Sequence, residues 1–86
     1  MEESELVIRI LACANKAAGT TLALGPDGDL PLEAFHFDSL SLFAFMVEVE
    51  TNCGVDFDTI LQNSESLGTV RSTATFIASR QKTASP

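Results

Sequence analysis

Apolar side chains recur at helical spacing near the start of the chain. Over residues 3–18 they are three or four positions apart, which places on one helix face Leu6, Val7, Ile10, Leu11, Ala14 and Ala17. Acidic residues in the first turn, Lys16 in the last turn and Gly19 just beyond it suit the two ends of such a helix. We therefore expect a first helix over residues 3–18.

The longest apolar run predicts a second helix over residues 39–53, and this helix has two apolar sides. At 100° per residue, the side that should face the core holds Leu42, Phe45, Met46, Val49 and Cys53. Leu40, Phe43 and Val47 lie on a second side, with Ala44 at its border and Glu50 at one edge. A surface helix needs only one apolar stripe. The second stripe therefore indicates either burial on all sides or a binding partner.

Residues 19–38 form one long connection. Its centre, residues 25–29, is dense in turn residues, and Pro31 should discourage a helix there. Five apolar residues of this loop should nevertheless pack on the helices and hold the loop in place: Leu22, Leu24, Leu30, Leu32 and Phe35. A loop of this length in a compact domain usually has a function.

The remaining chain predicts a short element and a last helix. Residues 54–68 read as a bend and one turn that begins near Asp56 or Asp58, with inward-pointing Val55, Phe57 and Leu67. Thr69 should cap a helix from residue 70 to about residue 82. We thus expect an all-α fold: one domain over residues 1–82, a small bundle of three long helices and one short one, and a flexible tail over residues 83–86.

Charge and composition exclude several functions. The net charge of −7, from 12 acidic and 5 basic residues, makes nucleic acid a poor partner. It suits partners with basic surfaces, or it simply keeps the protein soluble. Cys13 and Cys53 are too few for a disulfide framework and should be buried free thiols. One histidine and two distant cysteines give no metal site. The sequence has no apolar run long enough to span a membrane and no signal peptide, so we expect a cytoplasmic protein. We also expect a monomer.

A serine stands where the polar connection meets the second helix, in Asp38-Ser39-Leu40. Aspartate and serine are both favoured at helix N-caps. Further along, Glu48-Val49-Glu50 is followed by Gly54-Val55, and Leu67-Gly68-Thr69-Val70 precedes the last helix. Together these motifs resemble the carrier-protein family, the acyl carrier proteins and their peptidyl and aminoacyl relatives, over roughly residues 3–82.

The resemblance implies a modified serine. In that family the serine of this motif is esterified by 4′-phosphopantetheine, which a phosphopantetheinyl transferase takes from coenzyme A; here that residue is Ser39. The thiol of the arm then carries an acyl or aminoacyl group as a thioester. The partners would be a loading ligase and the enzymes of fatty-acid, polyketide or nonribosomal-peptide-type biosynthesis. The resemblance also implies that the carrier itself is not an enzyme. Asp38 would contribute to recognition and to orienting the arm.

The resemblance also implies a docking face on the second helix, formed by Leu40, Phe43, Ala44, Val47 and Glu50. Ser41 and Ala44 stand where carboxylates are common in the family, which favours more hydrophobic docking and a specialised pathway over primary lipid synthesis. His36 and Phe37 stand where the family often has a glycine and a small or apolar residue. We interpret His36 as a loop histidine, because nothing in the sequence orients a nucleophile beside it.

Other interpretations stay open at this point. Ser39 is alternatively an N-cap or first-turn serine with no modification. The second apolar side of residues 39–53 then packs under the long loop through Phe35 or Phe37, or it makes the chain a small helical interaction module that binds partners through Leu40, Phe43 and Val47. A hydrolase that uses Ser39 lacks a base. The sequence does not name the cargo or the pathway.

Overall fold

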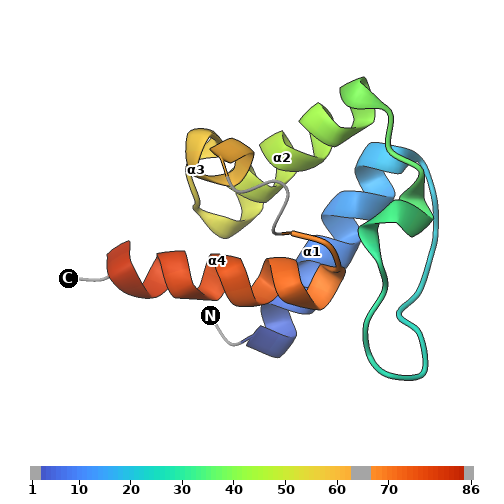
Figure 1. Ribbon diagram of the computed structural model, residues 1–86, viewed down its shortest axis with the longest axis horizontal. Helices are drawn as coiled ribbons and strands as arrows, with labels where there is room; N and C mark the ends of the chain where they lie inside the picture. The colour runs from blue at the N-terminus through green and yellow to red at the C-terminus, as the bar shows by residue number, and fades with distance from the viewer. Residues whose placement is uncertain (1–2, 63–66, 85–86) are drawn as a thin grey trace.

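The protein is a small helical bundle, described here by a computed structural model of residues 3–62 and 67–84 (Figure 1). Its elements are α1 (Glu3–Ala18), a 3-10 turn η1 (Leu32–Phe35), α2 (Ser39–Cys53), α3 (Phe57–Gln62) and α4 (Val70–Ala84). The described residues contain four α-helices and no strand. The predicted all-α class, with three long helices and one short one, is confirmed.

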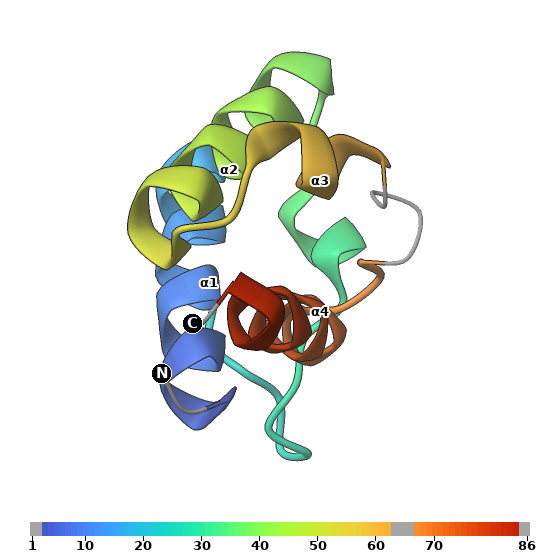
Figure 2. The same cartoon turned by 90° about the vertical axis from the view of Figure 1, so that its left-hand side faces the viewer.

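Helix α1 lies at the centre of the packing. It contacts both α2 and α4, and Figure 2 shows α4 nearly along its axis, with α1 on one side and η1 on the other. The buried residues come from every element and include Leu6, Ile10, Ala14, Phe45, Val49, Ile60, Val70, Ala74 and Ile77. These residues repeat at the three- and four-residue spacing of the sequence, so the amphipathic pattern places each helix face on one shared core.

The ends of α2 follow from its flanking residues. At its start, Asp38 is extended and its side chain caps the helix. At its end, Gly54 adopts φ 71° and donates its N–H to the Glu50 carbonyl at 3.1 Å. A left-handed residue after the last turn favours glycine, since a side chain there is strained. The predicted bounds of α1 and α2 agree with the structure.

Helix α4 is longer than the sequence predicted. The Thr69 hydroxyl oxygen accepts a hydrogen bond from the Ser72 N–H at 3.0 Å, as expected of a cap. The helix then runs to Ala84, two residues past the predicted end, because neither threonine nor alanine is a helix breaker of the kind that glycine and proline are. The predicted tail thus includes two helical residues. Residues 85–86 lie outside the described part of the chain, as does the side chain of Phe57.

The long loop is anchored at both of its halves. In the first half, the side chain of Asn15 donates to the Leu22 carbonyl at 2.9 Å and accepts from the Leu22 N–H at 2.8 Å. In the second half, the Leu32 N–H donates to Gly68 and the Val70 N–H donates to Leu30, both at 2.9 Å. The predicted packing of the loop's apolar residues is confirmed. Phe35 is buried, and the loop's four leucines are partly buried against the core: Leu22, Leu24, Leu30 and Leu32.

One expectation about the loop was wrong. Pro31 was expected to discourage a helix, yet η1 begins at the next residue. Pro31 has φ −66° and ψ 139°, an extended conformation just before the turn. A proline there costs no hydrogen bond within the turn, because it precedes the first helical residue.

Candidate functional site

The start of α2 presents a serine that is not needed as a cap. The Asp38 Oδ1 atom accepts a hydrogen bond from the Ser41 N–H at 2.7 Å, so Asp38 is the N-cap residue. That hydrogen bond lowers the pKa of the Asp38 carboxyl below its ordinary value. Ser39 is the first helical residue and is exposed. Of the alternative interpretation of Ser39 as an N-cap or first-turn serine, the N-cap part is therefore wrong and the first-turn part is confirmed; the expected exposure of Ser39 at the head of a helix is also confirmed.

The second apolar side of α2 is exposed beside Ser39. Leu40 is 77% exposed and Phe43 is 55% exposed, whereas Ala44, Val47 and Glu50 are half-buried. Leu40, Phe43 and Val47 are spaced by three and four positions, so they share one helix face. Exposure falls along this face from its N-terminal end, next to Ser39, toward its C-terminal end. The predicted face exists, and its open part lies in the first two turns of α2.

Two loop phenylalanines pack toward the core, not over this face. Phe37 stacks on Phe35 with ring centroids 5.5 Å apart and on Phe45 with centroids 5.2 Å apart. Phe35 and Phe45 are both buried. The alternative in which the loop covers Leu40 and Phe43 through these rings is therefore wrong. The stack instead fixes the chain segment that leads into Ser39.

A cavity of about 370 Å³ lies between η1, the start of α2 and the chain segment before α4. Its lining residues are Leu32, Glu33, His36, Phe37, Leu42, Leu67 and Gly68. Leu42 is one helical turn from Ser39 and so lies on the same side of α2. Most of the lining is apolar, which suits a small apolar group, with His36 and Glu33 as the ionisable members.

His36 has an unusual backbone. It ends η1 with φ 52° and ψ 47°, the left-handed region, and is the one non-glycine residue of positive φ in the described chain. Its N–H donates to the Glu33 carbonyl at 3.1 Å, and its side chain is exposed. The predicted exposed loop position is confirmed. The sequence did not reveal the left-handed backbone or the place of His36 in the cavity wall.

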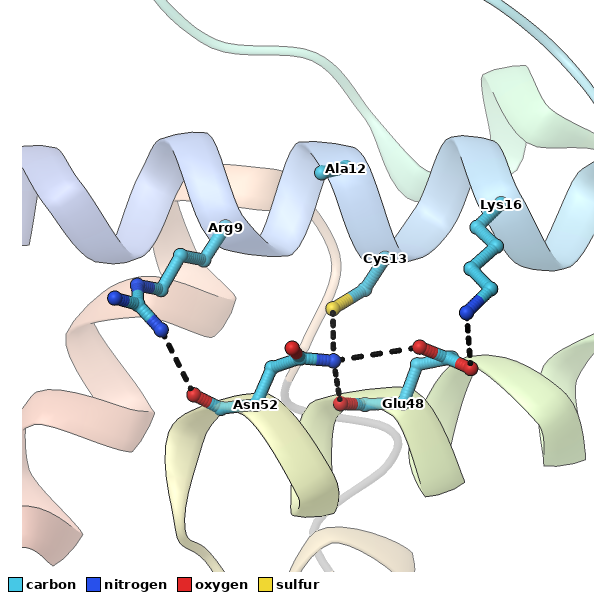
Figure 3. A pocket seen from close by; sticks show the side chains of 6 residues that line it. All are labelled: Arg9, Ala12, Cys13, Lys16, Glu48 and Asn52. Carbon is cyan, nitrogen blue, oxygen red and sulfur yellow. Dashed lines mark hydrogen bonds and ion pairs between the residues drawn. The ribbon is translucent and has the colours of Figure 1, made fainter.

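A second cavity, of about 200 Å³, lies between α1 and α2 (Figure 3). Polar contacts cross it: Lys16 pairs with Glu48 at 3.2 Å, and Arg9 donates to the Asn52 carbonyl oxygen at 3.2 Å. The Asn52 side-chain nitrogen donates to the Glu48 carbonyl at 2.8 Å and lies 3.8 Å from the Cys13 sulfur. Because these groups satisfy one another, we interpret the cluster as a link between two helices.

Both cysteines are buried thiols outside any disulfide, as predicted. Burial, aided by nearby Cys53 and Glu48, raises the pKa of the Cys13 thiol to about 11. Burial also raises the pKa of Cys53. The described residues hold no group of three or more histidine, cysteine or acidic side chains that is able to bind a metal ion. Neither thiol therefore has the low pKa and access of a reactive cysteine.

No protein-family model matches the chain, and searches of curated proteins and of solved structures return no match. Among the described residues, no helix has both the length and the apolar character needed to cross a membrane.

Proposed function

We propose that this protein is a carrier that bears 4′-phosphopantetheine on Ser39. One observation carries the proposal: Ser39 is exposed at the first position of α2 while its neighbour Asp38 performs the capping. A serine at the N-cap would hold its oxygen against the backbone N–H groups of the first turn. Here that oxygen is not required by the helix, so a transferase can reach it without unfolding α2.

The surroundings of Ser39 fit the group. The largely apolar cavity of about 370 Å³ begins one turn away at Leu42, which gives part of an arm or its cargo a surface to contact. The backbone N–H groups and dipole of the first helical turn tolerate a phosphodiester. When attached, the group supplies a thiol that holds an acyl or aminoacyl cargo as a thioester.

The chain's own part in the attachment is small. The Ser39 oxygen forms a bond to the phosphorus next to the pantetheine moiety of coenzyme A, and the phosphoanhydride bond to the nucleotide breaks. Adenosine 3′,5′-bisphosphate leaves, and the serine proton passes to a base of the transferase. No base beside Ser39 is needed, so the chain is not itself an enzyme. The carrier then raises the effective concentration of its cargo at successive enzymes, and we place it in the cytoplasm as a monomer.

The exposed apolar face is the proposed docking surface. Leu40 and Phe43 present large side chains within two turns of Ser39. Glu50 and the half-buried Ala44 and Val47 extend that face along α2. A partner that covers Leu40 also reaches the attachment point, so a single surface serves the transferase, a loading ligase and downstream synthase enzymes.

Intact-mass spectrometry tests the attachment. The chain is co-expressed with a promiscuous phosphopantetheinyl transferase, and we expect the mass of one phosphopantetheine to be added. Ser39→Ala should show no gain. Ser41→Ala, which removes another hydroxyl from the same turn, should show the full gain. An unmodified wild type, or an equal gain on Ser39→Ala, contradicts the proposal.

The exposure of Leu40 and Phe43 also supports a second candidate, an unmodified helical module that binds partners through Leu40, Phe43 and Val47. Binding experiments separate the two. In the carrier proposal, enzymes that act on the cargo need Ser39. In the module, Ser39→Ala binds like the wild type, whereas Leu40→Ser and Phe43→Ser lose binding.

A further inference from the structure

Positive charge is absent from the middle of this chain. Residues 17–70 contain no lysine and no arginine. The same span holds the acidic residues Asp27, Asp29, Glu33, Asp38, Glu48, Glu50, Asp56, Asp58 and Glu65. His36 is therefore the one side chain in this span that is able to carry a positive charge near neutral pH.

His36 occupies a position that favours a different residue. Its φ of 52° is readily adopted by glycine but strains a side chain. In the described part of the chain, no hydrogen bond or ion pair of the imidazole offsets that strain. The side chain instead lines the cavity of about 370 Å³, together with Glu33 and Leu42. The imidazole nitrogens of His36 are therefore available to a ligand at this cavity.

The attachment point is within reach of that imidazole. His36 and Ser39 are three positions apart, so their Cα atoms are at most roughly 11 Å apart. A histidine side chain and a phosphate ester on serine together span most of this distance. Glu33 from η1 is the charged side chain that lines the cavity with His36, and Asp38 lies two positions further along the chain. Leu67 and Gly68, on the opposite wall, contribute no charge. The charged residues nearest to His36 in this region are therefore acidic.

We propose that His36 is a positioning residue that binds the phosphodiester of the group carried on Ser39. This inference rests on the proposed function. A phosphodiester on Ser39 adds a negative charge next to Asp38, and protonated His36 is the local group that offsets it. The contact is a charge-assisted N–H to O hydrogen bond. It directs the base of the arm toward the cavity and away from Leu40 and Phe43, and so leaves the docking face open to partners.

Phosphorus NMR of the loaded protein tests the contact. A phosphodiester has no proton to lose between pH 5 and pH 8, so its 31P resonance moves in this range only if a neighbouring group titrates. We expect the 31P resonance of the wild type to move with pH across this range. His36→Asn, which tolerates a left-handed backbone, should load to the same extent by mass and show no such shift.

A second measurement needs no variant. The imidazole proton resonances of the wild type are followed against pH before and after loading, and we expect the midpoint to move to higher pH on loading. A 31P resonance that is independent of pH, an equal 31P shift in His36→Asn, or an unmoved imidazole midpoint overturns the inference and leaves the proposed function intact. Absence of any mass gain overturns the proposed function, and the inference with it.

Discussion

Two phenylalanines on either side of Ser39 in the sequence should respond differently to truncation. Phe37 precedes Ser39 and is stacked between Phe35 and Phe45, with centroid separations of 5.5 and 5.2 Å. Phe43 follows Ser39 and is 55% exposed. We expect Phe37→Ala to destabilise the fold and Phe43→Ala to weaken partner binding at nearly unchanged stability. Each variant is thus the control for the other.

The magnitudes follow from the two environments. Truncating a fully buried phenylalanine costs roughly 3–5 kcal/mol, and each aromatic pair contributes about 0.5–1.5 kcal/mol beyond burial. Because Phe37 is only partly buried but makes two such pairs, we expect a loss of about 2–3 kcal/mol for Phe37→Ala. For Phe43→Ala, the loss of a half-exposed ring is offset in part by the better helix propensity of alanine, which leaves a loss below about 1 kcal/mol.

Urea unfolding monitored by circular dichroism measures both. With an m-value of about 1 kcal/mol/M for a chain of this size, Phe37→Ala should unfold at a midpoint lower by about 2–3 M, and Phe43→Ala by less than about 1 M. Unchanged m-values are required for this comparison. Equal midpoint changes in the two variants, or a larger one for Phe43→Ala, would refute the assignment of one ring to the stack and the other to the docking face.

Cys13, with its pKa raised to about 11 from 9.0, should form thiolate roughly 100 times less readily than in the unfolded chain. Peptide mapping after iodoacetamide treatment should show labelling at least that much faster in urea, and equal rates would contradict the burial. The loop carboxylate Asp29 accepts from the Arg71 N–H at 2.9 Å and the Leu30 N–H at 2.8 Å. Burial raises the pKa of Asp29, but these two hydrogen bonds, together with a hydrogen bond from the Thr69 side chain and the charge of Arg71, outweigh it, and the net change is a lowering. The stabilisation is therefore present above the ordinary value of 3.8 and is lost as the pH falls through the folded-state value. Asp29→Ala should cost about 1 kcal/mol at pH 7, and its difference from the wild type should shrink below about pH 4; a difference independent of pH would show that the carboxylate charge is not involved.

Local signals were enough to predict the long helices. Residues 3–18 and 39–53 combine apolar periodicity with residues that suit helix ends, and the structure has both helices at those bounds. Leu67 is buried, as expected of an apolar residue that follows a polar stretch. Local residue preferences placed Ser39 at the head of a helix but did not decide whether Asp38 or Ser39 is the cap, because both residue types are favoured there.

Contacts between distant parts of the chain were not predictable in the same way. The hydrogen bond between Asp29 and Arg71 joins positions 42 apart, and nothing in either neighbourhood indicates it. Thr73 is buried although polar, because its hydroxyl donates to the Thr69 carbonyl at 2.7 Å. The cavity that His36 lines is also lined by Leu67, which is distant from His36 in the sequence. Such features come from tertiary packing between segments that are distant in the sequence, and the local sequence around any one residue does not indicate them.

The bonds between the loop and the start of α4 have a consequence for the order of folding. Leu30 and Leu32 meet Val70 and Gly68 across some forty residues, so these contacts form only after a large ring of chain has closed. The contacts within α2 are local and form quickly. During synthesis we therefore expect Ser39 to be presented on a nascent helix before the wall that contains His36 is complete. A ribosome-bound chain that ends before residue 67 is the stage at which this sequence of events is visible.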